Sequence, residues 1–375
     1  MPIKIVNHSD LDNSQKEVVM LRPFDQQVYI SGPPGSGKTS VAILRTKMLL
    51  ENGFSSMLFV LYNHSLYGYL STIFKRMNIS SNTSINTKDK YFFALARQLR
   101  CLPDSYFDIP NYEMKYNMLL DNILSSSIAP VYEMCMIDEA QDFSEKELRI
   151  LRRLSKKVIA VADFDQKIYE TNATELLFND LKRYKLETVY RFGRDIAAVV
   201  EQLSKSGERL TGKVTQMGST KPYLIKSSGS DAIDALCNII KNKKLSDGTM
   251  AIISPLRKNL TDLSAILSSR KVDHFVAPTN DDFRSYNFDS NKPLLIPSLS
   301  SKGLEFDTVV LYKYSGGMWD SQMRKNILYV SLSRACRDLY IIEDSGSWIE
   351  LKNLKGITEM SANNKGGSQD DDYEF

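Results

Sequence analysis

Cysteine is scarce in this chain, long apolar runs are absent and the charge is nearly balanced, and each shortage argues against a class of protein. The 375 residues include four cysteines, with no Cys-x-x-Cys pair among them: Cys101, Cys135, Cys237 and Cys336. Their scattered placement indicates a reducing compartment and argues against a disulfide framework or a zinc site. No apolar run approaches the roughly 18 residues of a membrane-spanning helix and no signal peptide is seen, so we expect a cytoplasmic protein with no membrane partner.

The length and the charge of the chain set wide bounds. A chain of 375 residues can form two or three domains with their own cores. A formal net charge of +3 permits nucleic-acid binding but does not indicate it. Residues 355–375 are polar, rich in Gly and Ser, and acidic at the end, which predicts a disordered acidic tail.

A glycine-rich loop follows the β-rich run Val28-Tyr29-Ile30-Ser31 and precedes a helical pattern. It matches G-x-x-x-x-G-K-[ST] at Gly32, Gly35, Gly37, Lys38 and Thr39. Glycines accept the backbone angles that turn N–H groups toward a triphosphate, and the helix N-terminus adds partial positive charge. Lys38 can reach the β- and γ-phosphates, and the Thr39 hydroxyl can bind Mg²⁺. A flexible surface turn is the alternative, but the strand before and the helix after favour a nucleoside triphosphate site.

Two further strands end in polar residues that suit such a site. The apolar run Met134–Ile137 leads into Asp138-Glu139-Ala140-Gln141-Asp142. Asp138 can hold Mg²⁺ through water, and Glu139 can act as the general base toward the attacking water. An acidic pair alone is more often a helix cap, and the upstream glycine loop reverses that preference. The run Val158–Ala162 leads into Asp163-Phe164-Asp165-Gln166, where Gln166 can sense the γ-phosphate.

The alternation of apolar strands and helical patterns predicts an α/β fold with its chemistry at the carboxyl ends of parallel strands. After about residue 188 the alternation starts again and predicts a second α/β domain without a glycine loop. Its expected strands are 223–226, 250–254, 274–276, 294–297, 308–312 and 339–342, with helices at 233–241 and 260–267. Residues 63–130 carry aromatic side chains at helical spacing, which favours a core over a platform for bases.

Taken in order, these features resemble the superfamily 1 nucleic-acid motor ATPases of the UvrD/Rep type. Seven motifs carry the resemblance: Leu11–Gln15, the glycine loop, Asp138–Asp142, Asp163–Gln166, Tyr190-Arg191, Lys302-Gly303-Leu304-Glu305-Phe306 and Tyr329–Ala335. It implies two RecA-like parallel-sheet domains with the ATP site in the cleft between them. The implied domains are 1–187 with a reduced helical insertion at 64–128, then 188–354, with the tail at 355–375.

The resemblance also implies a role for each matching residue. It assigns the adenine base to Gln15 and Tyr190, and the phosphates to the loop residues Gly32, Gly35, Ser36, Gly37, Lys38 and Thr39. Thr39 and Asp138 would bind Mg²⁺, with Glu139 as the base. The γ-phosphate would be met by Gln166, Arg191 and Arg334, and the ribose by Glu305 beside Gly303.

The sequence departs from the family where relatives touch the strand. The aromatic residue that follows the Gln-x-Ile-Tyr motif in relatives is missing, because Gln166-Lys167-Ile168-Tyr169 continues into Glu170-Thr171. Pro297 and Leu299 stand where relatives carry Thr and His, and the second insertion is essentially absent. Base stacking contributes about 1–3 kcal/mol per base, so we expect a weak or different grip on single strands. Tyr62, Asn63 and His64 are the remaining candidates for nucleic-acid contacts.

We therefore expect an ATP-dependent translocase or helicase that moves on single-stranded nucleic acid, with DNA favoured over RNA. The resemblance implies 3′→5′ movement. The alternative is a regulatory NTPase subunit that switches a partner such as a nuclease without robust unwinding. The end of the tail, Asp370-Asp371-Asp372-Tyr373-Glu374-Phe375, resembles the tip of bacterial single-stranded-DNA-binding proteins, which implies docking to a protein partner; a solvated acidic tail is the alternative.

Overall fold

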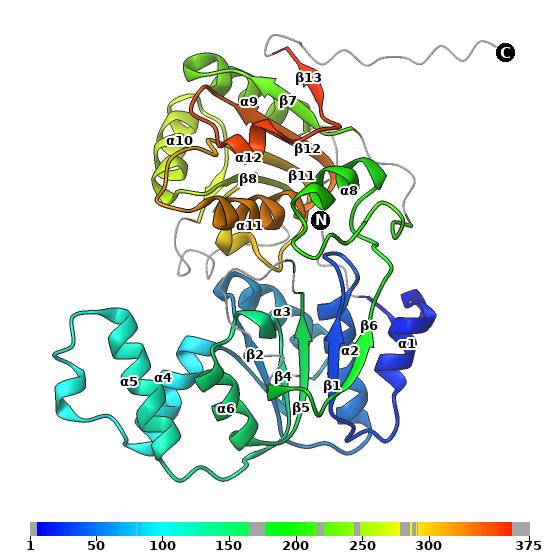
Figure 1. The fold of residues 1–375 in the computed structure, drawn as a ribbon, viewed down its shortest axis with the longest axis vertical. Coiled ribbons are helices and arrows are strands. Elements are labelled where there is room, and N and C mark those ends of the chain that lie inside the picture. The colour runs from blue at the N-terminus through cyan, green and yellow to red at the C-terminus, as the bar shows by residue number, and fades with distance from the viewer. Residues whose placement is uncertain are drawn as a thin grey trace. The chain divides into compact units, whose positions relative to one another are not determined.

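The computed structural model describes residues 6–79, 81–163, 165, 177–215, 221–243, 248–277, 286, 290 and 292–361. The chain divides into two compact units between Tyr190 and Arg191, slightly beyond the predicted boundary at residue 187. Each unit is built around one parallel sheet flanked by helices (Figure 1), so the predicted α/β fold class is confirmed. Gln166 and the acidic residues 370–375 lie outside the described residues.

The sheet of the N-terminal unit has the strand order β3-β2-β4-β5-β1-β6, with every neighbouring pair parallel. The strands are β1 (Val28–Ser31), β2 (Met57–Leu61), β3 (Thr83–Thr87), β4 (Tyr132–Ile137), β5 (Ser155–Ala162) and β6 (Lys182–Lys185). The described helices are α1 (Asn13–Met20), α2 (Lys38–Glu51), α3 (His64–Arg76), α4 (Lys88–Leu99), α5 (Tyr112–Ser125) and α6 (Glu145–Leu154). Because β5 lies between β1 and β4, the segments that follow these three strands meet at one edge of the sheet.

Helices cover both faces of this sheet, which explains why its central strands carry continuous apolar runs, such as Val158–Ala162 of β5. Alternate strand residues, among them Leu58 and Cys135, share an apolar cluster with side chains of α4, α5 and α6. These three helices lie together in Figure 1. Side chains alternate along a strand, so Phe59 points to the opposite face, where its ring meets Phe74 of α3 edge-on at 5.3 Å.

The predicted helical insertion at 64–128 is not wholly helical. Within it, β3 pairs with β2 and forms an edge strand of the sheet, with Leu58 opposite Ser84. The residues of β3 are Thr-Ser-Ile-Asn-Thr, which contain one large apolar side chain and therefore lack the pattern of a buried strand. The rest of the insertion forms α3, α4 and α5.

The C-terminal unit has a second parallel sheet, in the order β13-β7-β12-β11-β8-β10-β9. Its strands are β7 (Tyr223–Lys226), β8 (Met250–Ser254), β9 (Phe275–Val276), β10 (Leu294–Pro297), β11 (Phe306–Tyr312), β12 (Ala335–Glu343) and β13 (Thr358–Met360). Its described helices are α8 (Arg194–Val200), α9 (Gly229–Lys243), α10 (Arg257–Ser269), α11 (Ser321–Leu332) and α12 (Ile349–Lys352). The sheet core is apolar on the face covered by α9 and α10.

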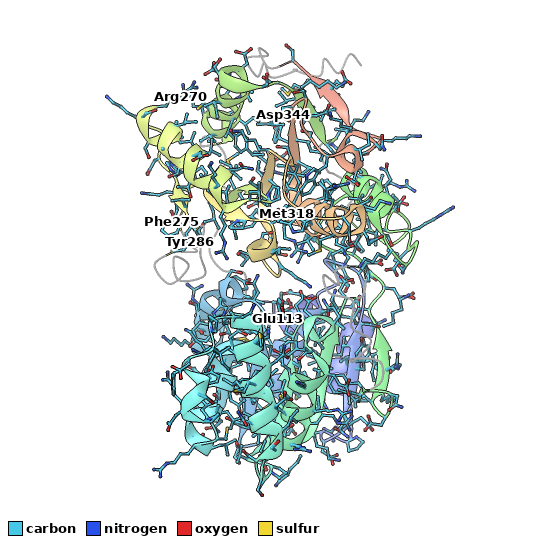
Figure 2. The ribbon with its side chains drawn as sticks, turned by 60° about the vertical axis from the view of Figure 1, so that its left-hand side comes forward. Glu113, Arg270, Phe275, Tyr286, Met318 and Asp344 are labelled. Carbon is cyan, nitrogen blue, oxygen red and sulfur yellow. The ribbon has the colours of Figure 1, made fainter. Side chains whose placement is uncertain are left out.

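Two expectations for this unit need correction. The tail was expected to be disordered from residue 355, yet residues 358–360 form β13 and pair with β7, because an edge strand needs backbone hydrogen bonds more than an apolar sequence. The expected strand at 274–276 begins only at Phe275, because the His274 ring bonds to Ser264 and to the Val272 carbonyl instead. Phe275 packs against Tyr286, with ring centroids 5.1 Å apart (Figure 2). Among the described residues, no helix is both long enough and apolar enough to cross a membrane.

Candidate nucleotide site

The glycine loop between β1 and α2 has a backbone that side chains would disturb. Gly35 and Gly37 have φ values of 78° and 81°, in the left-handed region that favours glycine. A Cβ on Gly37 would lie 2.6 Å from the Gln15 amide nitrogen, and one on Gly32 would lie 2.6 Å from the Leu186 carbonyl oxygen. Other segments of the chain therefore pack closely against the loop, which would not be so for a flexible surface turn.

The Lys38 side chain lies inside this loop. Its ammonium donates to the carbonyl oxygens of Gly32 at 2.7 Å and Pro33 at 2.9 Å, and to the Asp163 carboxylate at 3.1 Å. An ammonium group has three hydrogens, so these three acceptors use all of them. Asp163 follows β5, and its contact with Lys38 is a direct consequence of β5 lying beside β1.

Thr39 and Asp138 come together across the same edge of the sheet. The Thr39 hydroxyl donates to the Asp138 carboxylate, 3.2 Å from Oδ2. Burial and the neighbouring Glu139 charge raise the pKa of Asp138 to about 7, against the opposing effects of Thr39 and Lys38. The predicted Mg²⁺ ligands thus form a pair of oxygen donors in a site that already carries excess negative charge.

Gln141 connects the two acidic segments, a role that the sequence analysis did not assign. Its amide nitrogen donates to the Glu139 carboxylate at 2.5 Å, and its amide oxygen accepts from the Asp163 N–H at 3.0 Å. Glu139 itself has a left-handed backbone, with φ of 54°. A buried amide that bridges two acidic segments fixes both. The motif Asp138–Asp142 contained the signal, because Gln141 is its one side chain that both donates and accepts.

Gln15 and Tyr190, the predicted adenine contacts, both touch the loop. Gln15 completes a capping box at the start of α1, because its amide oxygen accepts from the Asp12 N–H at 3.1 Å. Its amide nitrogen donates to the Ser36 carbonyl at 2.9 Å. The Tyr190 N–H donates to the Gly35 carbonyl at 2.9 Å, and the Tyr190 hydroxyl donates to Asp12. Both predicted residues therefore also hold the loop.

The residues of this site fit a nucleotide phosphate and a divalent cation. The Ser36 hydroxyl is buried and has no hydrogen-bond partner among the described residues, so the loop holds an uncommitted donor. The Thr39 and Asp138 oxygens are the hard donors that Mg²⁺ prefers. In the described part of the chain, no three His, Cys, Asp or Glu side chains gather into a complete metal site. Mg²⁺ is commonly held by one or two protein ligands together with phosphate and water.

The candidate nucleic-acid residues have structural partners. Tyr62 meets Phe143 edge-on at 6.0 Å, and the Lys88 ammonium lies 5.2 Å from its ring centre. Asn63 caps α3 by accepting from the Ser65 N–H at 3.4 Å. The His64 ring lies 3.6 Å from the Asp89 carboxylate. These contacts account for the three residues as structural elements, and their part in strand binding stays a prediction.

In the C-terminal unit, the residues of three predicted motifs lie together. Arg191 donates to the Glu305 carboxylate and to the Ser333 carbonyl, both at 3.1 Å. Arg334 is 1% exposed and donates to the Val330 and Leu304 carbonyls at 2.8 and 3.0 Å. Gly303, with φ of 85°, makes the turn that brings Leu304 and Glu305 into these contacts.

Comparison with known proteins gives one family match and several distant structural likenesses. Residues 71–182 match the family model of the UvrD/REP helicase N-terminal domain, and no curated protein matches the chain. The C-terminal domain of a possible DNA helicase from Lactobacillus strain WCFS1 is 17% identical, over 46% of this chain and 98% of its own, with a TM-score of 0.38. Arterivirus nonstructural protein 10 (helicase) is 14% identical over 91% of this chain and 63% of its own, with a TM-score of 0.44. Its complex with DNA is 13% identical, over 88% and 62%, with a TM-score of 0.41.

The chain thus spans less than two thirds of the length of the arterivirus proteins. The family match runs from within α3 to the first residue of β6 and includes both acidic segments of the site, Asp138–Asp142 and Asp163. It agrees with the resemblance that the ordered motifs predicted. Over residues 71–182, this chain is therefore similar to the N-terminal domain of the UvrD/REP helicases.

Proposed function

We propose that this chain is an ATP-dependent nucleic-acid translocase or helicase, which couples ATP hydrolysis to 3′→5′ movement on single-stranded DNA. The observation that carries the proposal is the meeting of Lys38, Thr39 and Asp138 at one edge of the N-terminal sheet, within a glycine loop built for close approach. The family match supports a helicase in general. ATP, the strand type and the direction are the proposed details.

The N-terminal unit supplies the groups that phosphoryl transfer needs. Thr39 and Asp138 would hold Mg²⁺, which neutralises charge on the phosphates when bound. The loop N–H groups and Lys38 would bind the phosphate oxygens, because phosphoryl transfer depends mainly on positioning and charge stabilisation. Glu139 would accept the proton of the attacking water. Its carboxylate is oriented by Gln141, so it is held in one position before any substrate binds.

The two C-terminal arginines are proposed to stabilise the γ-phosphate. Arg191 is paired with Glu305 and can exchange this carboxylate for phosphate, since the Glu305 side chain is 55% exposed. Arg334 is 1% exposed, so its guanidinium would first have to leave its buried position. Glu305 is proposed to bind the ribose, and Gln166, outside the described residues, to sense the γ-phosphate.

Single-stranded DNA is proposed as the track, with Tyr62, Asn63 and His64 as candidate contacts at the start of α3. They follow β2 at the carboxyl edge of the sheet that also carries the glycine loop. Lys88 covers part of the Tyr62 ring, so a stacked base would have to share the ring with this ammonium group.

Steady-state ATP hydrolysis, with and without single-stranded DNA or RNA oligonucleotides, tests the proposal. We expect stimulation by DNA that is lost in Lys38→Ala and Glu139→Gln. Displacement of streptavidin from the 5′ or the 3′ end of an oligonucleotide then reports direction, and 3′→5′ movement removes it from the 5′ end. Hydrolysis that no polymer stimulates would contradict the motor and favour the alternative, a regulatory NTPase subunit that switches a protein partner.

A further inference from the structure

Asp163 was recognised in a motif but received no role of its own. It is 3% exposed, and its Oδ2 lies 3.1 Å from the Lys38 ammonium. The other carboxylate oxygen, Oδ1, accepts from the Asp165 N–H at 3.1 Å. Its own N–H is held by Gln141. Asp163 is therefore a fixed, buried carboxylate placed directly against the lysine that the phosphates need. Burial raises the pKa of Asp163, and the Lys38 ammonium opposes that rise.

The Lys38 ammonium cannot bind the nucleotide phosphates while it keeps all its present partners, so a phosphate must replace one of them. All three Lys38 hydrogens are used, two by the Gly32 and Pro33 carbonyls and one by Asp163. Of these acceptors only Asp163 is charged. An incoming phosphate would meet this charge at close range in a buried site, where like charges repel strongly. Asp163 is thus the partner that phosphate competes with.

We propose that Asp163 is a positioning residue that holds Lys38 in the nucleotide-free loop and yields it to the phosphates of the bound nucleotide. This rests on the proposed function, because it assumes that the loop binds a nucleoside triphosphate. Its consequence is that Asp163 weakens nucleotide binding. The pair keeps the loop and the lysine in place while no nucleotide is present, and an entering nucleotide must break the pair.

Asp163→Asn is the most direct test, because it has the same shape and lacks the charge. An asparagine offers one acceptor oxygen where two are needed, for the Asp165 N–H and for Lys38. The nucleotide-free state therefore loses its ion pair, while a phosphate-bound Lys38 does not need it. We expect Asp163→Asn to bind fluorescent ATP and ADP about tenfold more tightly, the effect of one charge-assisted hydrogen bond. Titration in EDTA as well as in Mg²⁺ separates this effect from metal binding.

The dependence on Lys38 distinguishes competition from a structural role. In a Lys38→Ala background, Asp163→Asn should change nucleotide affinity by no more than about twofold, because no ammonium remains to be released. Asp165→Asn serves as the control, since it removes a buried carboxylate two residues away. Melting temperatures confirm folding, and Asp163→Ser is a second variant should Asp163→Asn fail to fold.

Two outcomes overturn the inference and differ from failure of the proposed function. Equal or weaker nucleotide binding by both folded Asp163 variants would show that Asp163 does not compete with phosphate. The same gain in nucleotide affinity in the Lys38→Ala background would show that Asp163 affects nucleotide binding independently of Lys38. If the wild-type chain binds no nucleotide, by contrast, the proposed function itself is wrong.

Discussion

The side-chain amide of Gln15 donates to the Ser36 carbonyl oxygen over 2.9 Å, so helix α1 holds the glycine loop through a buried hydrogen bond. The same amide group accepts from the Asp12 N–H, which ties the start of α1 to the same residue. Gln15 thus fixes the position of the loop in the absence of a base. Recognition of adenine by this residue would have to use an amide that already has two partners.

Replacing Gln15 tests this bond. Gln15→Ala leaves the Ser36 carbonyl without its donor, and a buried unpaired group costs about 1–3 kcal/mol. We expect the KM for ATP to rise about tenfold with a small fall in melting temperature. The control is Gln26→Ala, whose amide donates only to the adjacent Gln27 carbonyl at 3.2 Å. An unchanged KM in Gln15→Ala would show that the bond does not support nucleotide binding.

Gly37→Ala tests the close approach of the loop. The added Cβ would lie 2.6 Å from the Gln15 amide nitrogen, at a φ of 81° that side chains rarely adopt. We expect nucleotide binding to be lost while the sheet stays folded, as measured by equilibrium binding and circular dichroism. Gly53→Ala is a matched control: its φ is 94°, and nothing lies within 4 Å of its added Cβ. It should cost about 1–2 kcal/mol of strain and leave binding intact. Retained binding in Gly37→Ala would contradict the loop geometry.

The Asp12–Tyr190 hydrogen bond predicts that the stability of the protein falls both at acidic and at alkaline pH. Burial alone would raise the pKa of Asp12, but hydrogen bonds from Tyr190, Gln15 and Ser14 outweigh it and lower that pKa. The folded state then binds fewer protons than the unfolded state, so this stabilisation is present above about pH 4 and is lost as the pH falls. Burial and the bond to Asp12 raise the pKa of Tyr190 to about 12. Stability should therefore also fall as the pH rises from about 10 to 12.

Denaturant unfolding of Asp12→Asn and Tyr190→Phe, measured from acidic to alkaline pH, checks both parts of this prediction. Asp12→Asn should reduce the loss of stability at acidic pH, and Tyr190→Phe should reduce the loss at alkaline pH. If both variants keep the wild-type profile, other groups control the pH dependence and the prediction is wrong.

Lys88 and Glu147 form a buried ion pair in the N-terminal unit. Their charged atoms lie 2.7 Å apart, and Glu147 also accepts from the Tyr116 hydroxyl. Lys88→Ala leaves the 2%-exposed Glu147 side chain without its cation, so we expect a loss of about 3–5 kcal/mol in the free energy of unfolding. Adding Glu147→Gln should restore part of that loss. The control is Lys47→Ala, which breaks an exposed pair with Glu51 and should change stability by less than about 1 kcal/mol. Equal effects of the two lysine variants would contradict the burial of the pair.

Substitution of Arg334 should mainly lower stability, and substitution of Arg191 should mainly lower catalysis. Arg334 is buried with its donors on the Val330 and Leu304 carbonyls, so Arg334→Ala should destabilise the C-terminal unit by about 3 kcal/mol or more. Arg191 is paired with a largely exposed carboxylate and with one carbonyl, so Arg191→Ala should lower the melting temperature less than Arg334→Ala does. Its kcat should fall about 10³-fold if it stabilises the γ-phosphate. Thermal melts and hydrolysis rates on both variants check this. A normal kcat in Arg191→Ala would remove this residue from the proposed site.

Local patterns were enough to identify most of the strands and the glycine loop. The loop, the strand that delivers Asp138 and Glu139, and the second α/β unit each have a signature within a few consecutive residues. The edge strands β3, β6 and β13 were not predicted, because edge strands are not buried on both faces and so lack an apolar run. Gln141 and Asp163 were visible in their motifs, but their partners were not.

The amino-acid sequence by itself determined the fold class, the glycine loop and the order of the motifs, because glycine spacing and apolar runs act on neighbouring residues. The tertiary structure decided which side chains the motif residues hold: Lys38 with Asp163, 125 positions away, and Tyr190 with Asp12, 178 positions away. It also buried Arg334 against its own unit. For Lys38 and Asp163 the physical reason is the strand order, since β5 lies beside β1 and brings these two distant segments to one edge of the sheet.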